Sequence, residues 1–175
     1  MADLDTLLVD HAHCERKAAA SARSFAARYP DEAAFVAAMA ALAAEEDDHF
    51  QRVRALLDAR GAAWGRSPKD AYVVHLLKAV RPPSELRKLD RLLIAAIIEA
   101  RSCERLGLLA EALPDAELRA FYRELFEAEA RHHGLFLEWA RYFGGRAAAD
   151  ARLAALLAHE AAYVTAKEPS AHVHG

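Results

Sequence analysis

Residues 10–50 read DHAHCERKAAASARSFAARYPDEAAFVAAMAALAAEEDDHF, and this stretch decides the fold that we predict. Its potential metal ligands and turn formers are Glu15, Pro30, Asp31, Glu46 and His49. The same residue types recur in the same order, at an almost constant offset, as Glu99, Pro114, Asp115, Glu129 and His132. Each half therefore contains a lone glutamate, a turn and a Glu-x-x-His motif. A four-helix bundle that holds two metal ions between its helices uses this ligand set.

The chain outside these motifs predicts further helix and no strand. Alanine is frequent, and apolar residues never alternate with polar ones as they do in a half-buried strand. The long helices that we expect cover about residues 3–28, 31–60, 84–113, 115–143 and 148–167. Asp31 and Ser84 are predicted to cap the second and third helices, and Gly61 to end the second. Short turns within each pair, and a long connection (61–83) with a short helix after Pro68, are typical of a ferritin-like bundle.

Composition favours one compact all-α domain. The 175 residues are 54% hydrophobic, which is enough for a substantial core. We expect residues 1–168 to form a single ferritin-like domain and residues 169–175 to be a flexible tail. The net charge of −3 gives no overall basic field that would attract nucleic acid. Two cysteines, no signal peptide and no apolar stretch long enough for a bilayer predict a cytoplasmic protein without a membrane partner.

Positions along the helices test whether the six candidate ligands could meet. Residues i and i+3 of a helix lie about 60° apart around its axis, so each Glu-x-x-His motif faces one way. Counted along the chain from the turn proline of each half, four glutamates lie at equal separations to within one position: Glu15, Glu46, Glu99 and Glu129. In antiparallel hairpins, residues equally far from the turn lie at the same level. All four carboxylates are therefore predicted to form one layer.

The third helix offers a competing glutamate. Cys103-Glu104-Arg105 repeats the string Cys14-Glu15-Arg16, which suggests Glu104 as the ligand. However, Glu104 lies only ten residues before the turn and about 140° around the helix from Glu99. We therefore predict that Glu99 binds metal and that Glu104 is an exposed or supporting partner of a nearby arginine.

The chemistry of the donor set favours two iron ions. Four carboxylates carry a charge of −4, which two divalent cations neutralise. Carboxylates with imidazoles suit iron or manganese, whereas a structural zinc ion prefers thiolates. By analogy with other carboxylate-bridged pairs of ions, Glu46 and Glu129 would bridge the metals, and Glu15 and Glu99 would each bind one.

Several neighbouring side chains have open roles. His11 lies one turn before Glu15 and is either a donor to that glutamate or a solvent-exposed histidine, which is the commoner case. His133 either lines the site or packs. Tyr122 is expected in the core, although its hydroxyl could also donate towards the metals. Cys14 and Cys103 are expected to be small buried residues.

Four strings resemble the tRNA isopentenyladenosine hydroxylase family, called MiaE. They are DHAHCERKAA (10–19), EEDDHF (45–50), IEARSCERL (98–106) and EAEARHH (127–133). The similarity runs from about Leu7 to Phe143. It implies a non-haem di-iron monooxygenase whose ligands fall on the six residues chosen above: Glu15, Glu46, His49, Glu99, Glu129 and His132.

The resemblance also implies the reaction. The family hydroxylates the isopentenyl side chain of 2-methylthio-isopentenyl-adenosine beside the tRNA anticodon. O2 would be the co-substrate. The electrons would come from an external reductase or ferredoxin-type donor, since the chain has no flavin, nucleotide or iron–sulfur motif. Candidate contacts to the anticodon loop are Arg81, Arg87, Lys88, Arg91, Arg101, Arg105 and Arg131, each of which could instead be a solvated surface residue.

Two other functions are compatible with the sequence. One is a ferritin- or rubrerythrin-like ferroxidase or another di-iron oxidase with the same six ligands, and the other is a metal-free helical scaffold. A ferroxidase would take up more than two irons per chain, and a scaffold would take up well under one.

Overall fold

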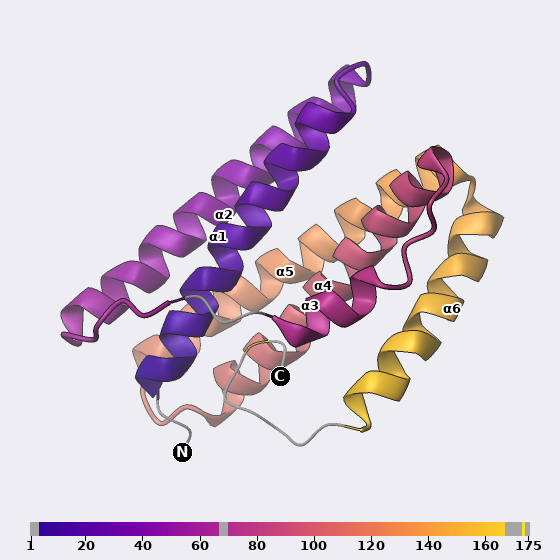
Figure 1. Ribbon diagram of the computed structural model, residues 1–175. Coiled ribbons are helices and arrows are strands. Elements are labelled where there is room, and N and C mark those ends of the chain that lie inside the picture. The colour runs from indigo at the N-terminus through magenta and orange to yellow at the C-terminus, as the bar shows by residue number, and fades with distance from the viewer. Residues whose placement is uncertain (1–3, 67–69, 167–172, 174–175) are drawn as a thin grey trace. The chain divides into compact units, whose positions relative to one another are not determined.

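The computed structural model describes residues 4–66, 70–166 and 173, and these form helices and no strand. The helices are α1 (Leu4–Arg28), α2 (Ala33–Ala59), α3 (Ala71–Leu77), α4 (Ser84–Ala112), α5 (Ala116–Gly144) and α6 (Arg146–Val164). The predicted all-α class and element order are confirmed (Figure 1). None of the helices within the described ranges combines the length and apolarity needed to cross a membrane.

The chain divides into two compact units. The first contains α1 and α2, and the second contains α3 to α6. The predicted single domain over residues 1–168 stays a prediction. The predicted tail (169–175) lies outside the described residues apart from Val173, whose backbone N–H donates to Asp10 Oδ2 at 2.8 Å.

The first unit is a helical hairpin whose two helices lie side by side (Figure 1). Buried side chains recur every three or four residues along both helices, as an amphipathic helix requires. Those of α1 are Leu8, Ala12, Ala19, Ala22 and Phe25, and those of α2 are Phe35, Met39, Leu42, Ala43, Val53 and Leu57. The Phe25 and Phe35 rings meet edge to face at 6.2 Å beside the turn, which fixes that end of the hairpin.

The ends of α2 follow different rules. Gly61 has a φ of +64° and follows the helix as predicted, and the amides of Gly61 and Ala62 donate to Asp58 and Leu57 carbonyls. These two hydrogen bonds form a Schellman motif. The predicted Asp31 cap is wrong, because Glu32 occupies the N-cap position and makes no side-chain cap hydrogen bond.

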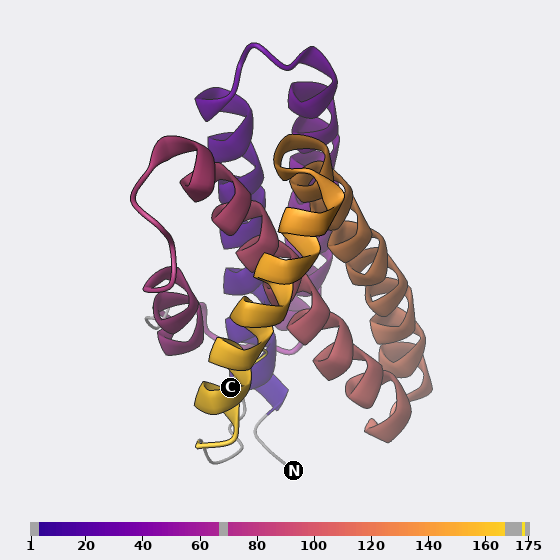
Figure 2. The same cartoon turned by 90° about the vertical axis from the view of Figure 1, so that its right-hand side faces the viewer.

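The second unit repeats the hairpin with α4 and α5 and adds α3 and α6. Figure 2 shows α6 passing in front of α4, and α6 contacts α3, α4 and α5. Asp115 caps α5 by accepting from the amides of Glu117 and Leu118. The predicted Ser84 cap is wrong, since Ser84 is the first residue of α4 and Pro83 precedes it as the N-cap.

The two turns differ in length by one residue. Two residues, Asp31 and Glu32, separate Pro30 from α2, whereas only Asp115 separates Pro114 from α5. This difference explains why the offset between the two lone glutamates is larger by one than the offset between the two Glu-x-x-His motifs. The extra residue is accommodated before the helix begins.

A buried ion cluster fastens α6 and the connection to α4. Asp90 is fully buried on α4 and accepts hydrogen bonds from Arg81 Nη2 at 2.6 Å and Arg152 Nε at 2.8 Å. Burial alone would raise the pKa of Asp90, but the two guanidinium groups outweigh it and lower the pKa to about 2. Asp90 therefore remains charged and holds three segments of the second unit together.

We predict that Asp90→Asn lowers the free energy of unfolding by about 2 kcal/mol at pH 7, because it weakens hydrogen bonds to a buried charge. Denaturant titration measures this effect. The folded-state pKa lies below the ordinary value of 3.8, so the contribution is present above that pH and is lost as pH falls towards 2. The gap between the wild type and the variant should shrink over this range. Asp58→Asn, which alters an exposed pair with Arg54, is the control and should cost less than about 1 kcal/mol.

Candidate metal centre

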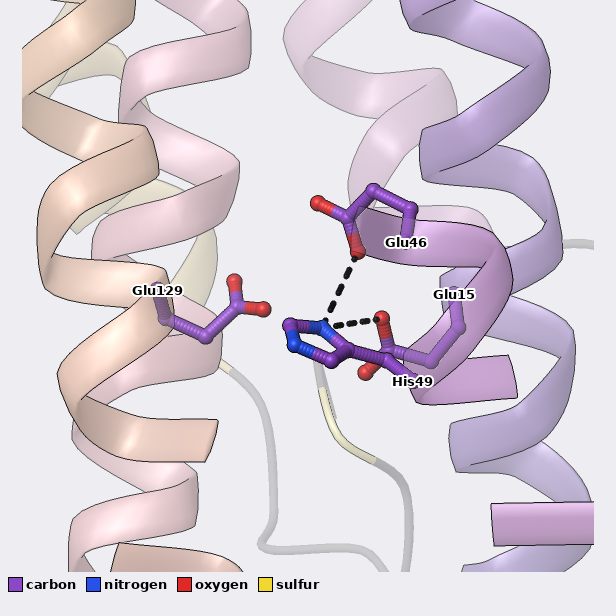
Figure 3. Close-up of side chains that lie close together, drawn as sticks. All are labelled: Glu15, Glu46, His49 and Glu129. Atoms are coloured by element: carbon purple, nitrogen blue, oxygen red, sulfur yellow. Dashed lines mark ion pairs between the residues drawn. The ribbon is translucent and has the colours of Figure 1, made fainter. Parts of the chain in front are cut away.

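The first unit brings together three of the six predicted ligands. Glu15 on α1 and Glu46 and His49 on α2 are each at most 5% exposed. His49 Nδ1 lies 3.6 Å from a carboxylate oxygen of Glu15 and 3.6 Å from one of Glu46, as Figure 3 shows. One potential ligand atom from each residue lies within 4.8 Å of the others. This spacing suits three donors to one metal ion.

His11 adds a fourth ionisable group to the first unit. It is 1% exposed, and its Nε2 lies 2.6 Å from Glu15 Oε1. The expectation of an exposed histidine is therefore wrong, and the alternative role, a hydrogen bond to Glu15, is correct. A residue four positions earlier on a helix lies on the same face, which explains why the two side chains meet.

The electrostatics of this cluster favour ionised carboxylates and a protonated imidazole. Burial alone would lower the pKa of His49, but its interactions with Glu15 and Glu46 outweigh burial and raise the pKa to about 10. Burial alone would raise the pKa of Glu15, but the hydrogen bond with His11 and the nearby His49 ring lower it well below its usual range. A cation is thus favoured beside these oxygens, and a metal ion would take the place of the proton on His49.

The second unit brings together the other three predicted ligands. Glu99 on α4 and Glu129 and His132 on α5 are each at most 6% exposed. His132 Nδ1 lies 3.8 Å from Glu129 Oε1, and one potential ligand atom from each of the three residues lies within 4.8 Å of the others. The donor types match those of the first unit. Each unit therefore presents two carboxylates and one imidazole.

The local structure distinguishes Glu99 from Glu104. The Glu104 side chain is 59% exposed and pairs with Arg101, as expected of an exposed partner. Of these two glutamates, Glu99 is the one that lies close to Glu129 and His132. The Nδ1 atom of the neighbouring His133 lies 2.7 Å from the Ala96 carbonyl oxygen. This nitrogen therefore contacts the backbone of α4 and is not available to a metal.

The two half-sites differ in how the lone glutamate is supported. Glu15 has His11 one turn earlier, whereas the equivalent position before Glu99 is Ala95. An alanine has no side-chain group that can hydrogen-bond to a carboxylate. At this position Glu15 has a hydrogen-bonding neighbour, whereas Glu99 has an apolar one.

Other side chains near the predicted ligands differ in their burial and their contacts. His13 Nε2 lies 3.0 Å from the Gly65 carbonyl oxygen, and Tyr122 is fully buried as expected. Cys14 and Cys103 are half-buried rather than buried. Among the proposed RNA contacts, Arg81 is engaged with the buried Asp90 and Arg101 with a buried carboxylate.

That carboxylate is Glu160, which the sequence did not single out. Its Oε1 accepts hydrogen bonds from Tyr72 Oη at 2.6 Å and from Arg101 Nη2 at 2.9 Å. The three residues link α3, α4 and α6, and Arg101 lies two positions after Glu99 on α4. A polar residue on an alanine-rich helix gave no signal for this contact, because its partners are far away in the sequence.

Comparison with known proteins identifies relatives across the chain. Residues 1–175 match the family model described as tRNA-(MS[2]IO[6]A)-hydroxylase (MiaE). A Pseudomonas putida protein named tRNA 2-(methylsulfanyl)-N(6)-isopentenyladenosine(37) hydroxylase is 39% identical over 147 residues, or 84% of this chain and 71% of that protein. A protein of the same name from Salmonella typhimurium is 41% identical over 103 residues, or 59% of this chain and 38% of that protein.

A solved structure is similar over nearly the whole chain. "Protein 43 with aldehyde deformylating oxygenase activity from Synechococcus" is 39% identical and has a TM-score of 0.90, covering 98% of this chain and 87% of that one. The predicted ferritin-like all-α fold with an additional C-terminal helix is confirmed.

We predict that His49 of metal-free protein is an imidazolium at pH 8, where an ordinary histidine is neutral. Long-range ¹H–¹⁵N NMR spectra of histidine-labelled protein would show this, with His49→Gln assigning the signal. The pKa of His49 in the folded protein is raised from 6.5 to about 10, so protonation of His49 stabilises the fold. This contribution is complete below pH 6.5 and is lost as pH rises through about 10. A neutral His49 at pH 8 would contradict the prediction.

Proposed function

Because the chain belongs to the tRNA-(MS[2]IO[6]A)-hydroxylase (MiaE) family, we propose that it hydroxylates the isopentenyl side chain of 2-methylthio-isopentenyl-adenosine in tRNA. The observation that carries this proposal is a family match over all 175 residues together with two buried half-sites of identical donor type. The names of the relatives support the substrate, and the donor types support the oxidative chemistry. A tRNA substrate also fits the predicted cytoplasmic location.

The proposed metal centre joins the two half-sites. Two carboxylates and one imidazole from each unit would hold two iron ions and neutralise their charge: Glu15, Glu46, His49, Glu99, Glu129 and His132. The donor set fits, because carboxylates and imidazoles suit iron and the set lacks the thiolates that a structural zinc prefers. Iron bound there would supply the redox chemistry for activating O2, which a protein without a redox cofactor lacks.

The protein's own side chains would orient the ligands and exclude water. His11 holds Glu15 through the 2.6 Å contact and thereby limits the directions in which that carboxylate can point. Apolar side chains lie one helical turn from the ligands: Leu42 and Val53 on α2, and Leu125 and Phe136 on α5, all at most 3% exposed. These residues would keep water away from the metal ligands.

Electrons would come from a separate protein, such as a reductase or a ferredoxin-type donor. The chain's two cysteines are too few for an iron–sulfur cluster with four cysteine ligands. Hydroxylation with O2 places one oxygen atom in the product and reduces the other to water, which consumes two electrons and two protons. The donor must supply both electrons.

We predict that Glu99→Ala lowers iron binding at least tenfold, because it removes a ligand, whereas Glu104→Ala retains iron. Metal analysis after anaerobic loading with Fe²⁺ measures both. The two residues lie five positions apart on α4, so Glu104→Ala controls for a general effect on the helix. Loss of iron in Glu104→Ala alone would contradict the assignment, and uptake far beyond two irons per chain would indicate a ferroxidase instead.

We further predict that iron-loaded protein, given O2 and a chemical reductant, converts the prenylated adenosine of tRNA to a product heavier by one oxygen atom. Mass spectrometry of nucleosides from tRNA that carries the precursor measures this. With ¹⁸O2 the added oxygen should carry the label. His132→Ala should reduce the product at least a hundredfold. Unmodified precursor after incubation with fully loaded wild-type protein would refute the proposed substrate.

The solved relative suggests a second candidate, an oxygenase that removes the formyl group of an aldehyde. This candidate is favoured by the printed activity of a structure that is 39% identical over 98% of the chain. The same loaded protein should then release formate from an aldehyde and leave the tRNA nucleoside unchanged. Parallel incubations with each substrate distinguish the two activities.

A further inference from the structure

An aromatic cluster lies where α5 ends in the second unit. Trp139, Tyr142 and Phe143 contact one another with ring centroids 5.1 to 5.7 Å apart. Lys88 of α4 lies over the Phe143 ring, with Nζ 3.1 Å from its centroid. Tyr142 is 66% exposed, the largest exposed fraction among the large apolar side chains of the described residues. An aromatic ring this exposed is available for contact with a partner.

Positive charges surround this cluster. Arg91 lies three residues after Lys88 and so on the same side of α4, and Arg87 and Arg146 are exposed. Nearby acidic groups offset part of this charge. Asp90 and Asp150 are engaged with arginines, and Glu85 and Glu138 are exposed. The end of the unit formed by the start of α4, the end of α5 and the start of α6 is therefore cationic in a chain of net charge −3.

We infer that this aromatic–cationic surface, formed by Lys88, Arg91, Trp139, Tyr142, Phe143 and Arg146, binds single-stranded RNA next to the base that is hydroxylated. The inference rests on the proposed function and names the RNA-binding residues for it. Tyr142 stacks on a base, and the cations contact phosphates. Exposed aromatic rings with flanking positive charge are the combination by which proteins bind single-stranded RNA.

The position of the surface suits an anticodon loop. Tyr142 lies ten residues after His132 on α5, which corresponds to about 15 Å along the helix. Both residues belong to the second unit. A base stacked on Tyr142 is therefore a few nucleotides from one at the proposed metal ligands. An anticodon loop presents unpaired bases over such a span.

A second aromatic and cationic cluster, in the first unit, is built around a ring that is partly covered by neighbouring side chains. The Trp64 ring is contacted by His13 at 4.1 Å, Phe50 at 5.8 Å and the guanidinium of Arg54 at 5.1 Å. Its surroundings are the protein's own side chains, so the ring serves to fix the chain after α2. Tyr142 is the better candidate for stacking because most of its surface faces solvent.

The test is binding of a fluorescently labelled anticodon stem-loop RNA to the iron-loaded protein, measured by anisotropy over a range of salt concentrations. Tyr142→Ala should weaken binding about fivefold or more, because a stacked base is lost. Tyr142→Phe keeps the aromatic ring and should bind like the wild type. Arg146→Gln should weaken binding and reduce the slope of log K against log salt by about 0.7.

Arg123→Gln is the matched control, since Arg123 is exposed in the first half of the same helix, far along it from Tyr142. It should bind RNA like the wild type. Circular dichroism and iron content should match the wild type in all four variants. Activity in Tyr142→Ala should fall through a higher KM for tRNA, with kcat at saturating tRNA retained.

Each outcome separates the inference from the proposed function. If the wild type binds and hydroxylates RNA while Tyr142→Ala binds equally well, the surface is wrongly assigned and the function stands. If Tyr142→Ala binds RNA like the wild type, turns over with dithionite and no longer turns over with a ferredoxin, the surface binds the electron donor instead of RNA. If the wild type neither binds nor hydroxylates RNA, both the surface and the function are overturned.

Discussion

Ionisable side chains buried on otherwise apolar helix faces impose the constraint on which the rest of the structure depends. An unpaired buried charge costs several kcal/mol, so these groups must be balanced by partners of opposite charge. In the first unit, Glu15 and Glu46 raise the pKa of His49 to about 10, and the resulting imidazolium offsets part of their negative charge. A proton and a metal ion thus compete for one imidazole. This competition links the acid–base state of the hairpin to metal loading.

In the second unit, the buried carboxylates between α4 and α6 are balanced by arginines rather than by a histidine. Asp90 and Glu160 are buried carboxylates that arginines neutralise, and both lie where α6 meets α4. These permanent cations leave no role for a metal, because a guanidinium stays charged throughout the ordinary pH range. The additional C-terminal helix therefore contributes the charges that fix α4, which also carries Glu99.

Local rules predicted most of the fold and the contents of each half-site. The helical spacing of residues and the positions of the turns predicted the helices and selected Glu99 over Glu104. These two features could be used because each depends only on residues within one hairpin. The cap predictions at Asp31 and Ser84 failed where turn geometry, rather than residue preference, decided which residue precedes the helix. The burial of His11 and the Glu160 cluster could not be predicted, since burial and distant pairing depend on tertiary packing. Convergence of all six ligands on one pair of metals stays a prediction.

The one-residue difference between the turns bears on how relatives of this chain can vary in length. One residue inserted within a helix rotates everything beyond it by about 100°. An insertion inside the helix, between its first residue and the Glu-x-x-His motif, would rotate both donors away from the apolar face. An insertion before the first helical residue leaves the phase of the helix intact. Among homologous sequences, insertions and deletions should therefore accumulate in the turns and in the connection between the hairpins. Within the helices they should be selected against.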